Sequence, residues 1–212
     1  AALRLFRKAI EKQPRYDIAL FNMGRLLFEK GNIREARYYL EHARAINSKR
    51  EKTFYLLGIL YEKTAETDKA IRMFRHLADI RPDNTDYSMI LAKLYTAVKD
   101  YGSAQDIYKE LIARGDASKH CLIDYAHLLN TTKQPDQAAQ VYRSVLTDYP
   151  DDARTHFLLA QTYLKQFKFN QALRSYVRSG RYLYSSLMVV VLVILFIIVL
   201  FFSFRIFFRL YH

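Results

Sequence analysis

Three side chains near the middle of the sequence could bind a metal ion if they lie on one helix. His120, Asp124 and His127 are spaced i, i+4 and i+7, which places two imidazoles and a carboxylate on a single helical face. Cys121 points about 100° away from that face and does not join them. Three ligands on one helix form a weak motif, and ordinary surface polarity explains it as well. We therefore expect no metal site.

Other combinations with catalytic potential also have simple structural explanations. The adjacent carboxylates Asp151 and Asp152 fall where a helix is expected to begin, and acidic residues are favoured at that position. No glycine-rich phosphate loop follows a strand, and no Ser or Cys stands beside an ordered His–acid pair. We expect neither catalytic residues nor a cofactor, and hence no enzyme and no small-molecule substrate.

The strongest signal in the sequence is a repeat of 34 residues that runs without insertion or deletion. An alanine column contains Ala2, Ala36, Ala70, Ala104, Ala138 and Ala172. Four residues later stands a large apolar column of Phe6, Leu40, Phe74, Tyr108, Tyr142 and Tyr176. Twelve residues before the last five alanines stands a small column of Gly24, Gly58, Ala92, Ala126 and Ala160. The small residues allow helices to approach closely, and the large residues fill the space beside them.

Each repeat has the apolar spacing of two amphipathic helices. In the first whole repeat these are expected near residues 17–30 and 33–47. Pro14, Pro82 and Pro150 occupy equivalent repeat ends, where a helix must stop. The sequence begins inside a repeat, so we expect earlier repeats to precede it.

This pattern resembles the tetratricopeptide repeat, whose unit has the same length and a similar small–large signature. Gly58, Tyr61, Ala70, Phe74 and Pro82 match that signature most fully. The resemblance implies an all-α, right-handed α-solenoid over residues 1–181. We expect its parts to be a second helix at 1–16 and repeats at 17–50, 51–84, 85–118, 119–152 and 153–181.

In this family a concave groove lined by the first helices binds proteins or peptides. Counting along each repeat places aromatic and basic side chains there: Phe21, Arg25, Phe28, Lys52, Tyr55, Lys63, Met89, Lys93, His120, His127, Arg154 and Phe157. Such a surface suits an acidic protein segment that carries apolar anchors.

One subtype of the family clamps the C-terminal carboxylate of chaperone tails with Lys and Asn residues at fixed positions. Phe21 and Arg25 stand where the first Lys and Asn would be, and Leu56 replaces the next Asn. Asp86 and Ile90 replace the third pair. The sequence therefore disfavours chaperone tails as ligands.

The end of the sequence has the composition of a membrane span. Between Arg181 and Arg205 there are 23 residues without a charge, which reach roughly 35 Å as a helix and cover a hydrocarbon core of about 30 Å. We expect a transmembrane helix at 182–205, followed by a short basic and aromatic tail at 206–212.

Basic residues are more frequent before this segment than after it. Five precede it, namely Lys165, Lys168, Arg174, Arg178 and Arg181, whereas Arg205 and Arg209 follow. This excess favours the cytoplasmic side of a single-pass membrane protein for the repeats, with the periplasmic or another face left open.

Three functions fit these features. The first is a membrane-anchored adaptor that gathers partner proteins through its groove, and the second is a permanent subunit of a larger membrane or envelope machine. The net charge of +12 also admits a nucleic-acid-binding solenoid. Glu29, Glu62 and Asp86 interrupt the basic residues on the groove, which argues against a continuous phosphate track.

Overall fold

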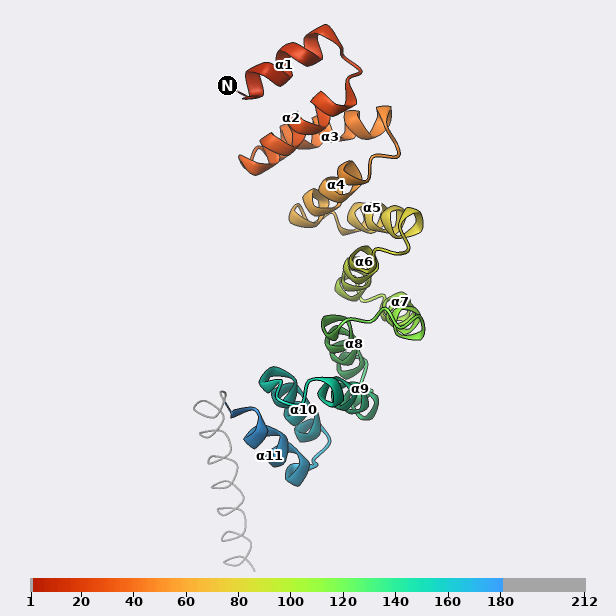
Figure 1. The fold of residues 1–212 in the computed structure, drawn as a ribbon, viewed down its shortest axis with the longest axis vertical. Helices are drawn as coiled ribbons and strands as arrows, with labels where there is room; N and C mark the ends of the chain where they lie inside the picture. The colour runs from red at the N-terminus through yellow and green to blue at the C-terminus, as the bar shows by residue number, and fades with distance from the viewer. Residues whose placement is uncertain (1, 181–212) are drawn as a thin grey trace, which may run out of the picture. The chain divides into compact units, whose positions relative to one another are not determined.

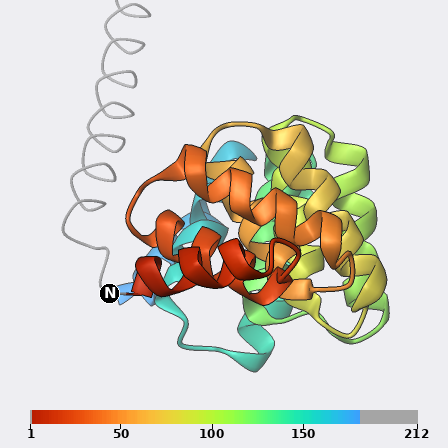
Figure 2. The same cartoon turned by 90° about the horizontal axis from the view of Figure 1, so that it is seen from above.

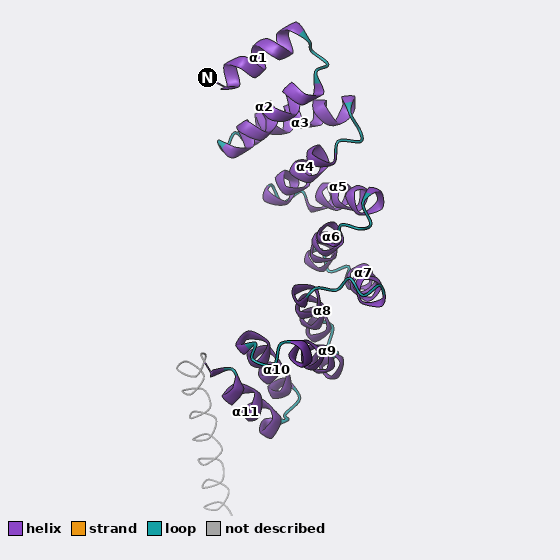
Figure 3. Cartoon of the chain, viewed as in Figure 1, coloured by secondary structure: helices purple, strands orange, loops and turns teal. Residues whose placement is uncertain are grey.

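The computed structural model describes residues 2–180, and these contain helices and turns but no strand (Figure 3). The helices are α1 (Ala2–Lys12), α2 (Asp17–Glu29), α3 (Ile33–Ile46), α4 (Glu51–Lys63), α5 (Thr67–Ile80), α6 (Thr85–Ala97), α7 (Tyr101–Ala113), α8 (Lys119–Thr131), α9 (Pro135–Asp148), α10 (Ala153–Lys165) and α11 (Phe169–Arg178) (Figure 1). The expected all-α repeat architecture is confirmed over this range.

The expected membrane segment at 182–205 and the tail at 206–212 lie outside the described residues. Among residues 2–180, no helix combines the length and the apolar composition that a bilayer crossing requires.

The described chain forms two compact units, divided between residues 117 and 118. The N-terminal unit contains α1 to α7, and the C-terminal unit contains α8 to α11. Within each unit, most contacts join helices that are consecutive in the sequence. Each unit is thus a stack of helix hairpins, and the expected right-handed superhelix stays a prediction.

The small and large columns pack together as their spacing predicts. A Cβ atom added to Gly24 would lie 2.6 Å from Leu40 Cγ, and one added to Gly58 would lie 2.5 Å from Phe74 Cε2. Leu40 and Phe74 are fully buried. Glycine is therefore present in α2 and α4 because the second helix of each hairpin fills the space that a side chain would occupy.

The first helix departs from this pattern. Ala2 and Phe6 occupy the alanine and large columns, but α1 contains no buried residue. In the later repeats these columns pack against the first helix of their own hairpin. Among the described residues, α1 packs mainly against the following helix α2 (Figure 1, Figure 2).

A left-handed residue ends the first helix of every hairpin. The positions are Gly31, Ala65, Lys99, Lys133 and Phe167, with φ between 58° and 80°. The next amide donates to a carbonyl five residues earlier, as from Asn32 to Leu27 at 2.9 Å and from Lys168 to Tyr163 at 2.9 Å. This bond satisfies a carbonyl that the helix end leaves unpaired.

Polar side chains join the two ends of a repeat. Asp17 accepts hydrogen bonds from Asn47 at 2.8 Å and from Arg50 at 2.6 Å. Burial opposes ionisation of Asp17, but these hydrogen bonds outweigh it and hold the pKa of the carboxyl below its ordinary value. Arg81 pairs with Glu51 at 3.0 Å in the next repeat along.

Candidate functional site

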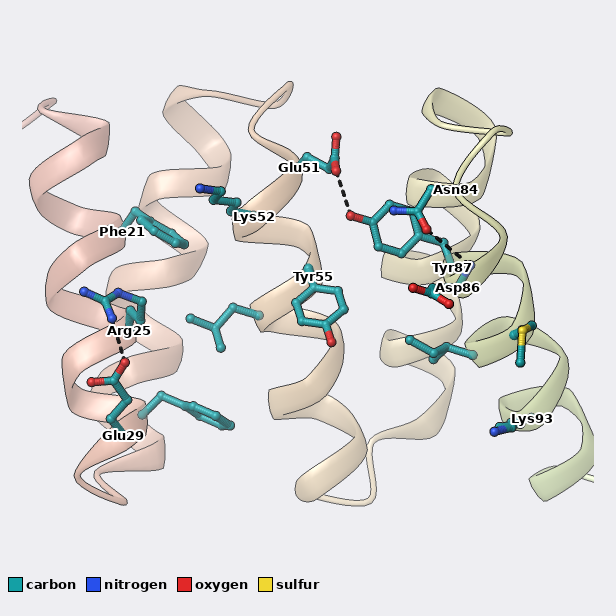
Figure 4. A pocket seen from close by; sticks show the side chains of 14 residues that line it. Phe21, Arg25, Glu29, Glu51, Lys52, Tyr55, Asn84, Asp86, Tyr87 and Lys93 are labelled. Atoms are coloured by element: carbon teal, nitrogen blue, oxygen red, sulfur yellow. Dashed lines mark hydrogen bonds and ion pairs between the residues drawn. The ribbon is translucent and has the colours of Figure 1, made fainter. Parts of the chain in front are cut away.

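A groove of about 790 Å³ lies across α2, α4 and α6, the first helices of three repeats in the N-terminal unit. Its lining is Phe21, Arg25, Phe28, Glu29, Glu51, Lys52, Tyr55, Leu56, Asn84, Asp86, Tyr87, Met89, Ile90 and Lys93 (Figure 4). The three helices are parallel members of the repeat, so equivalent columns of each contribute to one surface.

Seven of the residues predicted from the sequence meet in this groove: Phe21, Arg25, Phe28, Lys52, Tyr55, Met89 and Lys93. Lys63 lies next to them, because its Nζ is 5.5 Å from the centre of the Phe28 ring. The 34-residue register thus brings these residues to one hollow, and their binding of a partner stays a prediction.

The other four predicted residues belong to the C-terminal unit. His120 and His127 are exposed on α8, and Arg154 is exposed on α10. Phe157 is half-buried, with its ring centre 5.8 Å from that of Tyr176. Within residues 2–180, no three His, Cys, Asp or Glu side chains are arranged to hold a metal ion, His120, Asp124 and His127 included.

Aromatic rings form the apolar part of the groove. Tyr55 stands on α4 with 41% of its surface exposed. Its ring is 5.9 Å from that of Phe74 and 6.1 Å from that of Tyr87. Phe21 is buried beneath the guanidinium of Arg50, which lies 5.8 Å from the ring centre. The rings are thus held by neighbours, so an apolar anchor could bind without reordering them.

Acidic side chains also line the groove. Arg25 Nη1 is 2.7 Å from Glu29 Oε1. Glu51 accepts a hydrogen bond from the hydroxyl of Tyr87 at 2.7 Å and pairs with Arg81 (Figure 4). The lining therefore contains three basic and three acidic side chains.

The sequence analysis missed Glu51, Asn84 and Tyr87 as groove residues. Glu51 and Asn84 lie at repeat boundaries, where the first helices of their repeats begin. Asn84 does cap α6, since its side chain accepts from the amide of Asp86 at 3.2 Å. Glu29 and Asp86 were placed on the groove from the sequence, by the same helical spacing that placed Arg25 and Lys93 there.

The bond between Tyr87 and Glu51 fixes the groove at the junction of α4 and α6. Burial and then the adjacent carboxylate raise the pKa of Tyr87 to about 12. The phenol therefore stays protonated at neutral pH and keeps donating to Glu51. In contrast, Lys52 and Asp86 are exposed and make no ion pair with any described residue. They are charges of opposite sign available to a ligand.

Comparison with known families agrees with the repeat assignment. Three family models, each described as tetratricopeptide repeat, match residues 5–38, 27–94 and 119–162. The first two ranges overlap and lie in the N-terminal unit, and the third lies in the C-terminal unit.

Curated relatives are similar over most of this sequence. Anaphase-promoting complex subunit 3 of Schizosaccharomyces pombe is 26% identical over 175 residues, which is 82% of this chain and 26% of that protein. The BBSome complex member BBS4 homolog of Drosophila melanogaster is 24% identical over 192 residues, which is 84% of this chain and 39% of that protein. The chain spans less than half the length of either relative.

Solved structures share the fold at low sequence identity. YrrB, described as a TPR protein with an unusual peptide-binding site, has a TM-score of 0.65 at 18% identity, covering 82% of this chain and 90% of its own. MamA has a TM-score of 0.68 at 14% identity, covering 77% of this chain and 89% of its own. The chain therefore carries tetratricopeptide repeats, and its described residues have the fold of that family.

Proposed function

We propose that this protein is a non-enzymatic scaffold that binds a partner protein in the groove of α2, α4 and α6. Proteins with this repeat generally act as interaction scaffolds. The observation that carries the proposal is the placement of Tyr55, with a large exposed area, between the charged side chains of Lys52 and Asp86. A partner segment with an apolar anchor flanked by charges would fit this arrangement.

The preferred partner segment is acidic near the anchor. Glu29 is held by Arg25, and Glu51 is held by Arg81 and Tyr87. Because these acids already have cationic or donor partners, the charges of Lys52 and Asp86 are the ones that a ligand would meet. An acidic group beside the anchor would pair with Lys52.

Membrane recruitment is the second part of the proposal. It rests on the uncharged sequence at 182–204 and the basic residues before it, which would anchor the chain at 182–205 with its repeats on the cytoplasmic side. An anchored groove would raise the local concentration of its partner at the bilayer surface.

A photocrosslinking experiment tests the groove. Benzoylphenylalanine in place of Tyr55 should crosslink one major partner in intact cells, and the same group in place of Tyr38, exposed on α3, should not. Lys52→Glu should lower the Tyr55 crosslink several-fold, whereas Arg34→Glu, an exposed charge reversal on α3, should leave it unchanged. Equal crosslinking from Tyr38 and Tyr55 would refute the groove.

A permanent structural subunit is the second candidate function. The observation in its favour is that two relatives are named as members of multiprotein complexes. Extraction in mild detergent separates the two functions. A permanent subunit would elute in a complex of fixed stoichiometry, whereas an adaptor would elute mostly as the single chain.

A further inference from the structure

A second hollow lies on the C-terminal unit, and no residue of the proposed groove lines it. It is a trough of about 360 Å³ between α9 and α11, with α10 beneath. Arg143, Arg174 and Arg178 line it, together with Leu146, Thr147, Pro150, His156, Leu159, Tyr163, Gln171 and Ser175. No acidic residue contributes to this lining, and none of the three arginines forms an ion pair with a described residue. The arginine trough is therefore a concentrated positive surface.

The sequence around this trough is basic over a long range. No Asp or Glu follows Asp152, whereas eight Lys and Arg residues do. Of the five within the described residues, Lys168 is ion-paired, with Asp136 at 2.9 Å. The unit thus keeps an excess of positive charge at this end, where it would attract an anionic partner.

The turn before α11 places an aromatic residue where the fold favours a small or polar one. Phe167 occupies the left-handed column, with φ of 58° and 79% of its surface exposed. Gly, Ala and Lys fill the equivalent positions at 31, 65, 99 and 133. A bulky residue in this conformation is strained and gains no burial here in return. Neither the backbone strain nor the exposed ring of Phe167 stabilises the repeat, which indicates that this residue contacts a partner outside it.

Further exposed apolar side chains continue from this turn along α11. Phe169 is 51% exposed and its ring centre is 6.4 Å from that of Phe167. Leu173 and Val177 follow at four-residue intervals and are 50% and 61% exposed. The spacing places all three on one stripe of α11. The stripe and two of the arginines, Arg174 and Arg178, lie on different sides of α11, whereas Arg143 lies on α9.

We propose that α11 and the turn before it dock on a bilayer surface rich in anionic phospholipid. Phe167, Phe169, Leu173 and Val177 enter the boundary between headgroups and acyl chains, and the arginine trough binds headgroup phosphates. An apolar stripe beside basic residues is the pattern of helices that lie in a membrane interface. Arginine also suits phosphate oxygens, because its guanidinium donates two parallel hydrogen bonds.

Lipid fits these observations better than nucleic acid does. A phosphate backbone would use the arginines, but it offers nothing to the aliphatic side chains of Leu173 and Val177. A bilayer surface uses both. The docking surface also immediately precedes the uncharged stretch at 182–204 in the sequence. The proposal does not depend on the groove of the N-terminal unit.

Tryptophan fluorescence tests the docking directly, because the sequence contains no Trp. Phe167→Trp in the full chain gives a single tryptophan at the turn, whose emission is excited selectively over that of tyrosine. The chain is reconstituted with phosphatidylcholine vesicles that contain or lack phosphatidylserine and carry brominated acyl chains. With phosphatidylserine, the emission should shift to the blue and be quenched by the bromine atoms. This readout reports where the turn lies, whether or not another segment holds the chain in the vesicle.

Charge reversal then tests the arginine trough. Arg143→Glu, Arg174→Glu and Arg178→Glu together should weaken docking by roughly 100-fold, with the helical circular dichroism unchanged. Reversal of Arg34 and Arg72, exposed arginines of the N-terminal unit, should have no effect. Lys133→Trp, at the equivalent turn one repeat earlier, should stay unquenched.

Three results would overturn the proposal. The first is a Phe167→Trp emission that stays solvent-like in phosphatidylserine vesicles, and the second is equal quenching in the triple reversal. The third is protection of the fluorophore by a short DNA duplex but not by vesicles, which would assign the surface to nucleic acid. Quenching that requires phosphatidylserine and the three arginines would establish it.

Discussion

The arginine trough has a counterpart two repeats earlier whose charge is different. That hollow, between α5 and α7 of the N-terminal unit, has a volume of about 380 Å³. Pro82 and Leu91 line it where Pro150 and Leu159 line the arginine trough. Asp79 and Glu110 line it, however, where the later repeat has Thr147 and Arg178. The buried packing columns thus form the same hollow twice, and the exposed columns give the two hollows different charges.

The single arginine of the earlier hollow is also occupied locally. Arg114 is 2.8 Å from Asp116 and donates to the carbonyl of Pro82 at 2.8 Å. The comparison therefore separates two kinds of position. Packing columns should govern the free energy of unfolding, and exposed columns should govern binding with little effect on stability.

The largest expected effect is on a packing column. Phe74→Ala removes a fully buried ring that fills the space beside Gly58, and it should lower the free energy of unfolding by about 3–5 kcal/mol in urea titrations. Tyr38→Ala, at a site 57% exposed, should change it by about 0.5 kcal/mol or less. Similar losses at both sites would remove the distinction between the columns.

Overpacking the alanine column should cost less. Ala70 is fully buried on α5, so Ala70→Leu forces its neighbours apart and should lower the thermal stability by about 1–3 kcal/mol. Differential scanning calorimetry would measure the loss. A stabilised variant would show that α4 and α5 pack more loosely than the burial indicates.

The polar link between the two ends of the first whole repeat should give a smaller and pH-dependent effect. The folded-state pKa of Asp17 lies below the unfolded value of about 3.9. Its contribution to stability is therefore present above about pH 4 and is lost as the pH falls through the folded-state pKa. Asp17→Asn should cost about 1 kcal/mol at pH 7. The gap from the parent chain should close on acidification, and a gap that stays constant to low pH would contradict the assignment.

The smallest effect on stability is expected in the exposed columns. Glu110→Arg and Arg178→Glu exchange the charges of the two hollows, and each should change the free energy of unfolding by about 0.5 kcal/mol or less. Chemical denaturation of the two single variants would measure this. A loss of several kcal/mol at Arg178 would mean that the arginine supports the fold of α11.

The division between columns also explains which features the sequence could predict. The alanine, large and small columns recur every 34 residues, and they fixed the helices and the packing of Gly58 on Phe74. The same register placed Phe21, Tyr55 and Lys93 on one groove. A repeat pattern predicts the same packing for every unit, so it could not show that α1 differs. The alanine and large columns of α1 have no preceding helix among the described residues.

Side-chain partners could not be read from the register. The pairing of Arg25 with Glu29, and of Glu51 with Tyr87 and Arg81, depends on rotamers and on the spacing of neighbouring helices. These contacts reduce the positive charge that a count of lysines and arginines predicted for the groove. Phe167 was likewise visible in the sequence, but its importance depends on the left-handed turn that exposes it.

Contacts between consecutive helices have a mechanical consequence. Among residues 2–180, each hairpin is held mainly by the hairpins adjacent to it in the sequence. A pulling force along either unit would meet one interface at a time, so helices would peel away in succession at modest load. Such a stack would extend under tension and refold when the tension is released, because every lost contact is re-formed by residues close in the chain.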